Sequence, residues 1–457
     1  MEDHQQLSKE NIALKLPDFI NKDINLKELF RGSSIALIFK VAGAGMGYVF
    51  FWVISRMYGA ETVGVFSLCW TILIFSAMLG KAGLDSSIVR FLASMQTEHR
   101  QSDMKIIYRK GLTLVLFFSI LVALLLLLIR KPVGTLFFDQ KDSDTLIIMV
   151  VLALIPFSVM SYNSEALRGL KKIGLYSLLQ NGAVYFAALA IIILIWFLGS
   201  DTNFILQAVV ISLALASLAS LLLYKNTERK IQDSLPYTIQ TESLSWRHIL
   251  KVSFPMMIGS ALFMMLNWTD ILVLGIYRPE KDVGIYNIAV KIAALNSIAL
   301  VAINTIAAPK FAELHALSDK SPFRKLVKQV SLINTLVSLP VFLFILFFPE
   351  FLLKLFGSEF GEGKHALLIL ASGQFFNALC GSTMYVMNMS GMEIKGRNIM
   401  IASALINLCL NFLLIPQMGL TGGAIATMSS IVVWNVLALF FIYREHGFVT
   451  LPLNMNN

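Results

Sequence analysis

The stretch Tyr58-Gly59-Ala60-Glu61-Thr62-Val63-Gly64-Val65-Phe66 returns about 220 residues later as Tyr277-Arg278-Pro279-Glu280-Lys281-Asp282-Val283-Gly284-Ile285-Tyr286. Two other short stretches return at a similar spacing: Ile88-Val89-Arg90-Phe91 as Ala308-Pro309-Lys310-Phe311, and Leu167-Arg168-Gly169-Leu170 as Met389-Ser390-Gly391-Met392. Self-similarity at one fixed spacing indicates a repeated structural unit. Half of the chain is therefore one unit used twice.

The composition is that of a membrane protein. Hydrophobic residues make up 57% of the chain and charged residues 14%, with a mean hydropathy of +0.73. Soluble domains carry about 25% charged residues. The net charge of +9 would fit nucleic-acid binding, but in a membrane protein basic cytoplasmic loops explain it more simply.

Other site classes find little support. Cys69, Cys380 and Cys409 lie in apolar runs and make neither a disulfide framework nor a metal-binding spacing. The histidines lie in loops or at helix ends, and no phosphate-binding Gly-rich motif of the ATPase type is present in the sequence. We therefore expect a protein that is not an enzyme and that has no cofactor, apart from a coupling ion.

Twelve segments are apolar over the length of about 20 residues that a membrane helix needs. They are roughly 33–57, 63–89, 107–129, 145–167, 173–198, 203–224, 250–276, 284–307, 325–348, 365–389, 397–416 and 421–443. Continuous apolar runs, such as Leu112–Ile129, argue for helices and against the alternating strands of a barrel.

The loops predict the orientation. Lys and Arg gather in one alternate set of loops, around residues 100–110, 171–172, 225–247, 320–328 and 395–397. The positive-inside rule makes this set of loops cytoplasmic, which places both termini on the cytoplasmic side of the cell membrane. Six spans per half then give both halves the same orientation, related by an axis along the membrane normal.

These spans predict an all-α polytopic protein with two pseudo-symmetric six-helix lobes. The expected division is a cytoplasmic N-terminal segment over 1–32, a lobe over 33–224, a cytoplasmic linker over 225–249, a lobe over 250–443 and a tail over 444–457. The N-terminal segment lacks the short apolar core of a cleaved signal peptide. Repeated halves of this kind are typical of secondary transporters, whose substrate site lies between them.

Several motifs carry a resemblance to a known family. They are Ile54-Ser55-Arg56-Met57-Tyr58-Gly59-Ala60-Glu61, Gly83-Leu84-Asp85-Ser86-Ser87-Ile88-Val89-Arg90, Arg168-Gly169-Leu170-Lys171, Ala308-Pro309-Lys310-Phe311, and Asn407-Leu408-Cys409-Leu410-Asn411 followed by Ile415-Pro416 and Gly422-Gly423-Ala424. In order and spacing the chain after residue 33 resembles the polysaccharide-export flippases of the multidrug/oligosaccharidyl-lipid/polysaccharide exporter superfamily. The resemblance implies a V of two lobes around a central cavity, and a polyprenyl-pyrophosphate-linked sugar as cargo.

Cations inside the spans support an anionic cargo independently. Charges at membrane depth are costly and usually face a cavity, and lysine binds phosphate as a point charge. Lys40 and Lys291 have no acid nearby in sequence, whereas Lys81 and Asp85 are spaced to neutralise each other. We therefore favour Lys40 and Lys291 as cavity cations. Neither recurs in the other half, which favours a link to the asymmetric cargo over a role in the repeated architecture.

Weaker candidates for cargo binding complete the cationic set. Arg56 and Arg90 sit near span ends, as does Lys310, where a long side chain reaching the membrane surface also explains the charge. Lys81 stays a candidate in spite of its pairing with Asp85. Both interpretations remain open for these positions.

A polar group in the second half suits a coupling cation. Asp270, Asn407, Asn411 and Thr427 are expected at similar depth, with a backbone carbonyl such as that of Gly423. Oxygen donors of these kinds suit a hard cation. Lipid II flippases of the superfamily have a sodium site whose spacing matches Asn407, Asn411, Gly423 and Thr427, but Asn411 stands where they have an acid. Sodium or proton coupling is one interpretation, and plain hydrogen bonding between helices is the other.

The predicted function is the flipping of a lipid-linked oligosaccharide to the outer leaflet, with polysaccharide polymerase machinery as a further partner. The alternative of the same fold is a cation-coupled multidrug exporter, for which an acidic cavity would be expected. A polymerase or ligase would need a long outer loop, which the sequence lacks. A scaffold without transport would leave Lys40 and Lys291 as an unexplained cost.

Overall fold

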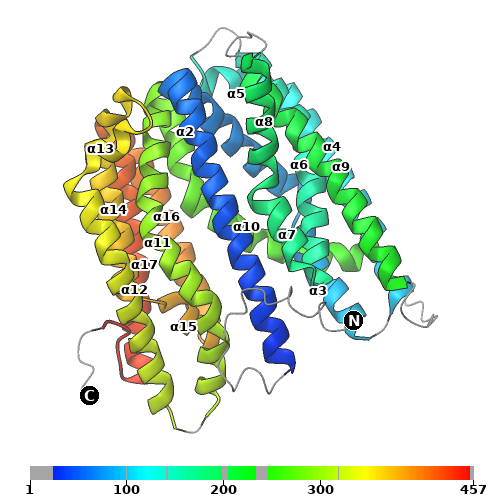
Figure 1. Cartoon of the computed structure of the whole chain (residues 1–457), viewed down its shortest axis with the longest axis vertical. Coiled ribbons are helices and arrows are strands. Elements are labelled where there is room, and N and C mark those ends of the chain that lie inside the picture. The colour runs from blue at the N-terminus through cyan, green and yellow to red at the C-terminus, as the bar shows by residue number, and fades with distance from the viewer. Residues whose placement is uncertain are drawn as a thin grey trace, which may run out of the picture.

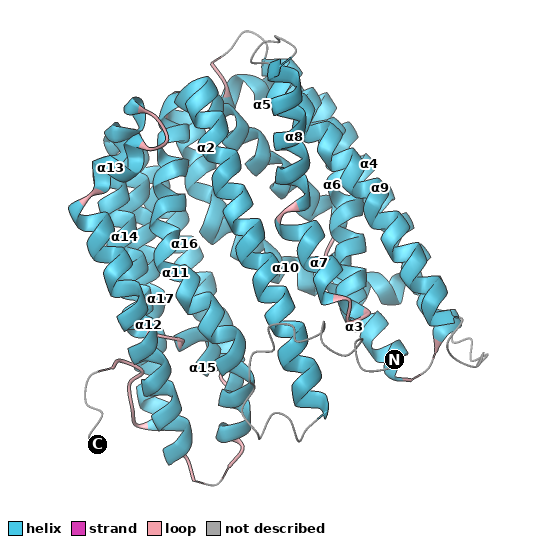
Figure 2. Ribbon diagram, viewed as in Figure 1, coloured by secondary structure: helices cyan, strands magenta, loops and turns pink. Residues whose placement is uncertain are grey.

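The computed structural model describes the backbone of residues 24–98, 100–139, 143–197, 204–232, 245–317 and 319–452, and side chains for most of these from residue 42 onward. In this part of the chain every regular element is helical (Figure 2). The predicted all-α membrane protein is thereby confirmed.

The helices of the first half follow the predicted spans. They are α2 (Ile24–Lys81), α3 (Leu84–Thr97), α4 (Gln101–Leu128), α5 (Arg130–Phe137), α6 (Ser143–Gly169), α7 (Ile173–Asn181), α8 (Ala183–Phe197) and α9 (Phe204–Gln232). The predicted spans 33–57 and 63–89 are joined in α2 by a kink at Gly59, whose φ is 80° and ψ −178°. The second of them breaks again at Ala82 and Gly83, where both residues have positive φ.

The second half has the same make-up. Its helices are α10 (Trp246–Tyr277), α11 (Glu280–His315), α12 (Ser321–Phe347), α13 (Pro349–Lys354), the 3-10 turn η1 (Ser358–Gly363), α14 (Lys364–Cys380), α15 (Thr383–Met389), α16 (Glu393–Met418) and α17 (Leu420–His446). Figure 1 shows the labelled helices from α11 to α17 on one side of the molecule and those from α3 to α9 on the other, with α2 between them.

Each of the twelve predicted segments coincides with a helix or with a broken pair of helices. In the described residues, eight helices are long and apolar enough to cross a membrane. The number rises to ten if α7 with α8, and η1–α14 with α15, each count as one bent span. The count of twelve, the division into lobes and its boundaries stay predictions.

The two halves touch at the repeated stretches around Gly64 and Gly284. A Cβ at Gly64 would lie 1.7 Å from the carbonyl oxygen of Glu280, and a Cβ at Gly284 would lie 1.9 Å from that of Ala60. Gly64 and Gly284 are repeat partners, as are Ala60 and Glu280. Small residues allow helices in membranes to approach this closely. The contact is thus reciprocal, as expected for two like units related by an axis.

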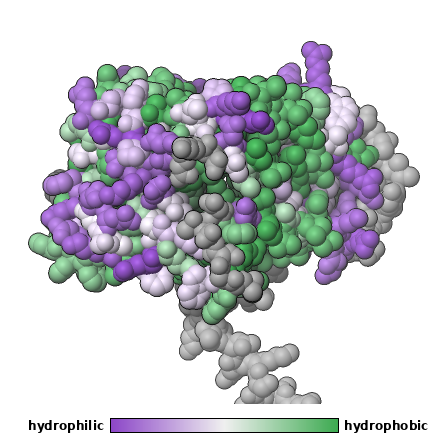
Figure 3. Space-filling view, turned by 90° about the horizontal axis from the view of Figure 1, so that it is seen from above, coloured by the Kyte–Doolittle hydropathy of each residue, from purple (hydrophilic) through white to green (hydrophobic). Residues whose placement is uncertain are grey.

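Further polar contacts tie the halves together at the same end of the molecule. The amide N of Ala60 donates to Glu359 Oε1 of η1 over 2.5 Å, and that of Asp139 donates to Glu280 Oε1 over 3.0 Å. Exposed ion pairs surround η1, among them Lys281–Glu362 and Lys364–Glu350. Seen from above, hydrophilic side chains gather on the side of the molecule where Figure 1 places α13, while apolar ones dominate to the right of centre (Figure 3).

Candidate functional site

The best-defined polar site lies at the break between α2 and α3. Lys81 is the last residue of α2, and Asp85 stands in the first turn of α3. The Lys81 Nζ lies 2.7 Å from Asp85 Oδ2, and the two side chains are 9% and 19% exposed. The break at Ala82–Gly83 separates the two residues, so this pair is held by a bend and not by one continuous helix.

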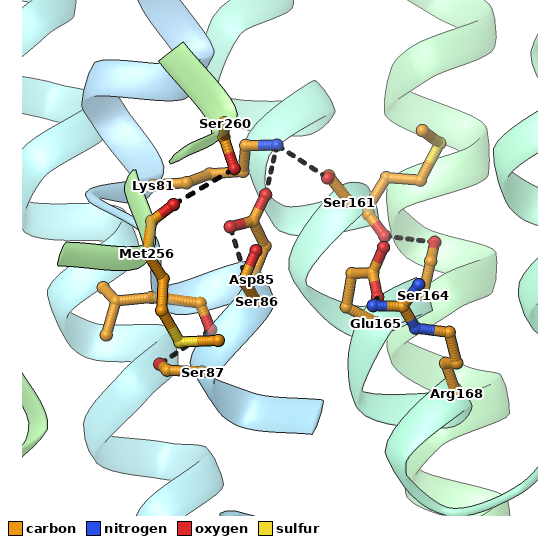
Figure 4. A network of polar contacts seen from close by, with 12 residues as sticks. Lys81, Asp85, Ser86, Ser87, Ser161, Ser164, Glu165, Arg168, Met256 and Ser260 are labelled. Carbon is orange, nitrogen blue, oxygen red and sulfur yellow. Dashed lines mark hydrogen bonds and ion pairs between the residues drawn. The ribbon is translucent and has the colours of Figure 1, made fainter. Parts of the chain in front are cut away.

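A neighbouring helix completes the surroundings of Lys81. Its ammonium group donates to Ser161 Oγ of α6 over 2.9 Å and lies 5.8 Å from the ring centre of Phe157. Asp85 Oδ1 accepts from the amide N of Ser86 over 2.8 Å. Figure 4 shows Lys81 reaching between Asp85 and Ser161. The ammonium is thus pre-positioned, with one acidic and one hydroxyl partner.

The ion pair forms part of the wall of a cavity of about 490 Å³ between the two halves of the chain. Its lining residues are Met78, Lys81, Gly83, Asp85 and Ser86 from the α2–α3 side, and Met256, Met257, Gly259, Ser260, Phe263 and Met264 from α10. Methionine side chains are flexible and polarisable, and they suit surfaces that must adapt to different shapes. The cavity therefore combines one charged wall with a deformable apolar one.

α3 and α10 meet closely beside this cavity. Ser87 Oγ and Ser253 Oγ are 2.6 Å apart, and both side chains are buried. A Cβ at Gly83 would lie 2.1 Å from the carbonyl oxygen of Ser253, and Gly83 has a φ of 76°. Glycine satisfies both demands at once, because it tolerates a positive φ and has no Cβ.

A second acid lies near the ion pair on α6. Glu165 pairs with Arg168 at 2.7 Å, and the Arg168 guanidinium lies 5.1 Å from the ring centre of Tyr176. Figure 4 shows this pair beyond Ser161, on the side away from α10. The charge of Glu165 is therefore neutralised by an arginine of its own helix.

The two favoured cations are placed differently. The backbone at Lys40 is helical within α2, but its side chain lies outside the described residues. Lys291 is half-buried on α11, with its Nζ 3.9 Å from the ring centre of Phe51. Its backbone carbonyl accepts from Tyr48 OH over 2.7 Å, and no carboxylate within ion-pair distance is found for it in the described residues. Lys291 does not line the cavity of Lys81.

The arginine and lysine candidates at span ends do not line the cavity of Lys81. Arg56 donates to the carbonyl oxygens of Leu355 (2.7 Å) and Lys354 (3.2 Å), at the end of α13. Lys310 is exposed and pairs with Glu313 at 3.0 Å. Arg90 is exposed on α3, one turn after the cavity residue Ser86. Arg56 and Lys310 thus have partners within the protein, and a role for Arg56 and Arg90 in cargo binding stays a prediction.

The polar group of the second half converges in part. Asp270 is 5% exposed, and its Oδ2 accepts from Tyr286 OH (2.7 Å) and from Thr427 Oγ1 (3.4 Å). The backbone N of Ile271 donates to Asp270 Oδ1 over 2.9 Å. The carboxylate is thus held by α11 and α17 together.

The asparagines join this group through a serine. Asn411 Nδ2 donates to Asn407 Oδ1 over 3.0 Å, and Asn407 Nδ2 donates to Ser430 Oγ over 3.3 Å. Ser430 in turn donates to the carbonyl oxygen of Thr427 over 2.8 Å. Asn411 Oδ1 is buried and has no hydrogen-bond partner in the described part of the chain. One acceptor is therefore left unpaired at the far end of the chain of contacts.

Tyr286 was not predicted from the sequence. It is fully buried, and a Cβ at Gly423 would lie 3.4 Å from its ring, so the tyrosine stands between Asp270 and Gly423. The repeat contained the signal, because Tyr286 is the partner of Phe66 and differs from it by the hydroxyl group. Ser161 and the cavity methionines carried no such signal.

The oxygen donors fit a hard monovalent cation better than a transition metal. No group of three or more His, Cys, Asp or Glu side chains able to hold a metal occurs among the described residues. Asp270 and Thr427 offer a carboxylate and a hydroxyl in contact with each other, whereas the unpaired Oδ1 of Asn411 lies further along, beyond Asn407 and Ser430. Carboxylate, hydroxyl and amide oxygens are the ligands that such ions take.

Comparison with known proteins agrees with this architecture. The model of the family described as "Polysaccharide biosynthesis protein" matches residues 29–315, and that described as "MatE" matches residues 255–413. The probable low-salt glycan biosynthesis flippase Agl15 of Haloferax volcanii is 26% identical over 180 residues, which are 38% of this chain. The match spans 38% of the length of that relative.

Solved structures share the fold. The lipid II flippase MurJ in an inward closed conformation has a TM-score of 0.71 at 14% identity, over 90% of this chain and 87% of MurJ. The MATE multidrug transporter DinF-BH has a TM-score of 0.64 at 17% identity, over 92% of this chain and 95% of the transporter.

Proposed function

The chain belongs to the polysaccharide biosynthesis protein family, and on this basis we propose that it flips a lipid-linked oligosaccharide across the cell membrane. The cargo would be a polyprenyl-pyrophosphate-linked sugar, moved from the inner to the outer leaflet for assembly of a surface polysaccharide. Support comes from the name of Agl15 as a glycan biosynthesis flippase and from the fold shared with MurJ.

The observation that carries the proposal is the cavity of Lys81. It lies between the halves, holds a pre-positioned ammonium group and has a methionine-rich wall opposite. A pyrophosphate entering it would compete with Asp85 for Lys81, while Asp85 keeps the amide of Ser86 as a partner. The ion pair would thus hold Lys81 ready and release it to the stronger anion.

Alternating access would follow if contacts between the halves at two places open in turn. The Gly64–Gly284 contact lies at one end of the molecule, and the Ser87–Ser253 contact lies beside the cavity. Opening one while the other stays closed would expose the cavity to each side in turn. The sugar would pass through the cavity while the polyprenyl chain stays in lipid. No covalent bond is made or broken in this scheme.

Lys40 remains a second candidate cation on this path. The repeat pairs its position with about Gly259, which lines the cavity from α10. Two like units related by an axis present equivalent positions to the space between them. Lys291 would then act at another depth, where its ammonium group lies over Phe51.

A coupling ion at Asp270 is the second part of the proposal. Sodium would be held by Asp270 and Thr427, with Asn411 as a further ligand if α16 moves toward them, and it would supply a positive charge that depends on the membrane gradient. Proton coupling would use the Asp270 carboxyl alone, held by Tyr286 and Thr427. Binding of either ion would make the conformation of the second half depend on the ion gradient across the membrane.

The rival function is export of cationic drugs, which the DinF-BH fold suggests. A cationic drug would favour an acidic cavity. Here Asp85 is neutralised by Lys81, and Glu165 by Arg168. The cavity therefore offers no unpaired carboxylate to a cationic drug, whereas an anionic cargo would engage the ammonium group of Lys81.

We place the protein in the cell (inner) membrane with both termini in the cytoplasm, next to polysaccharide polymerase machinery. Reporter fusions after Asp201 and Asn226 test the orientation, since the first position should report the exterior and the second the cytoplasm. The same result at both would refute the predicted span between them.

The transport proposal is tested in proteoliposomes with a fluorescent polyprenyl-pyrophosphate oligosaccharide in one leaflet and a quencher outside. The wild-type protein should equilibrate the lipid between leaflets, and Lys81→Ala should slow this at least tenfold. Arg229→Ala, which removes an exposed cation at the end of α9, is the matched control. Equal rates in empty liposomes, or selective uptake of cationic dyes, would refute the proposal.

A further inference from the structure

Three helix ends and the chain's tail meet at the lower end of the molecule in Figure 1, and none of the residues described below lines the proposed cargo cavity. α11 ends at His315, α12 begins at Ser321 and α17 ends at His446. After α17 the chain folds back and buries Phe448 against α12. Thr450 secures this tail, because its Oγ1 donates to the carbonyl oxygen of Cys380 over 2.5 Å.

The meeting point is a compact group of rings with a guanidinium at its edge. The ring centres of His315 and His446 are 5.4 Å apart, and Phe323 lies 5.2 Å from the first and 5.8 Å from the second. Phe448 lies 6.0 Å from His446, and the Arg324 guanidinium lies 5.8 Å from the Phe448 ring. We call His315, Arg324 and His446 the His–Arg cluster.

Each member of the His–Arg cluster has a buried nitrogen without a partner. His315 Nδ1, His446 Nε2 and Arg324 Nε make no hydrogen bond in the described part of the chain. Buried polar groups are nearly always hydrogen-bonded, so three orphans in one group call for a ligand. Arg324 Nε always carries a proton and needs an acceptor, and the imidazole nitrogens meet the same acceptor in the tautomer that places their proton there. The missing ligand therefore brings acceptors.

The charge around the cluster points the same way. Lys320 donates to the backbone carbonyl of His315 at the edge of the cluster. Two acids on these helix ends form ion pairs with other lysines, Glu445 with Lys395 at 2.6 Å and Glu313 with Lys310 at 3.0 Å. Asp319 accepts hydrogen bonds from Ser321 at 2.7 and 2.8 Å. The positive charge of the cluster therefore resides on Arg324, with Lys320 next to His315.

We propose that the His–Arg cluster binds a phosphate group. A phosphate offers several acceptor oxygens and a negative charge, which match arginine and histidine donors. Basic pockets at the ends of membrane helices on the cytoplasmic side are suited to anionic lipid headgroups. The phosphate would come from an anionic phospholipid of the inner leaflet or from free phosphate. Binding would tie α11, α12, α17 and the tail together.

The test uses the full-length protein purified in a neutral detergent. Thermal unfolding is followed while phosphatidylglycerol, phosphatidylcholine or inorganic phosphate is added, and bound lipid is counted by native mass spectrometry. Stabilisation by phosphatidylglycerol alone would identify a lipid headgroup, and stabilisation by inorganic phosphate at equal concentration would identify free phosphate. No stabilisation by either would overturn the proposal.

Variants separate this site from general attraction of a basic surface to anionic lipid. Arg324→Gln and the double variant His315→Gln/His446→Gln should each weaken the apparent affinity about tenfold. Arg229→Gln, an exposed arginine at the end of α9, should leave it unchanged. An equal loss in the Arg229 variant would refute a built site. If a cluster variant unfolds, Lys320→Gln, which keeps every ring in place, should still lower the affinity.

Discussion

The Lys81–Asp85 ion pair allows a structural role to be separated from a role in transport. The two charged atoms are 2.7 Å apart and the side chains are largely buried, at 9% and 19% exposed. With an effective dielectric constant of about 20, their attraction is roughly 6 kcal/mol, and most of this offsets the loss of hydration. Removing one partner leaves the other charge buried and unpaired.

We expect Lys81→Met to lower the free energy of unfolding by about 3 kcal/mol, at the lower end of the range for a broken buried pair. Asp85→Asn should cost less, because Ser161 still accepts from Lys81 and the amide oxygen still accepts from Ser86. The double variant Lys81→Met/Asp85→Asn should cost about 1 kcal/mol or less, since no uncompensated charge remains. The single changes are therefore strongly non-additive.

Two assays are read side by side on these variants. Unfolding in detergent gives the stabilities, and flipping of a fluorescent lipid-linked oligosaccharide in proteoliposomes gives the activity. The double variant should be nearly as stable as the wild-type protein and yet flip at least tenfold more slowly. Additive stability losses would refute the pairing, and wild-type flipping by the stable double variant would refute the role of Lys81 in binding cargo.

Lys40→Ala and Lys291→Ala should each abolish polysaccharide export in cells while insertion, measured by membrane fractionation, stays normal; wild-type export from both would exclude them as cargo cations. Asp270→Asn should cost only about 1 kcal/mol of stability, because Tyr286 and Thr427 can still donate to the amide oxygen, but flipping should lose its response to a sodium or proton gradient. An unchanged response would exclude this coupling site. Gly64→Val should overpack the contact between the halves and cost about 1–3 kcal/mol, because even a Cβ there lies 1.7 Å from the oxygen of Glu280; an unchanged melting temperature would refute the contact.

Part of the candidate site followed from local spacing. Lys81 and Asp85 are four residues apart, and their pairing could be expected from that alone. Asn407 and Asn411 contact each other at the same spacing, as Asn411 Nδ2 donates to Asn407 Oδ1. Thr427 was also expected near Asp270, because the two residues were placed at a similar depth in the membrane. The Thr427 hydroxyl does donate to the Asp270 carboxylate.

The rest of the site depended on neighbours far away in sequence. Ser161 reaches Lys81 across 80 residues, and Tyr286 stands between Asp270 and Gly423 where the sequence suggested an open ion site. Arg56 was a candidate for cargo binding, but its donors meet carbonyl oxygens 298 and 299 residues later. The residue pattern within one helix cannot predict such distant partners.

The sequence by itself determined that the chain lies in a membrane, that its spans are helices and that its halves are alike. These follow from hydropathy and from the need of every backbone group for an internal partner in lipid, which are properties of single segments. Only the tertiary structure decided that Gly64 meets Gly284 and that a cavity opens between Lys81 and the methionines of α10. Lipid is as apolar as the helix surfaces, so hydropathy cannot choose which helices touch, and close packing of small and polar groups makes that choice.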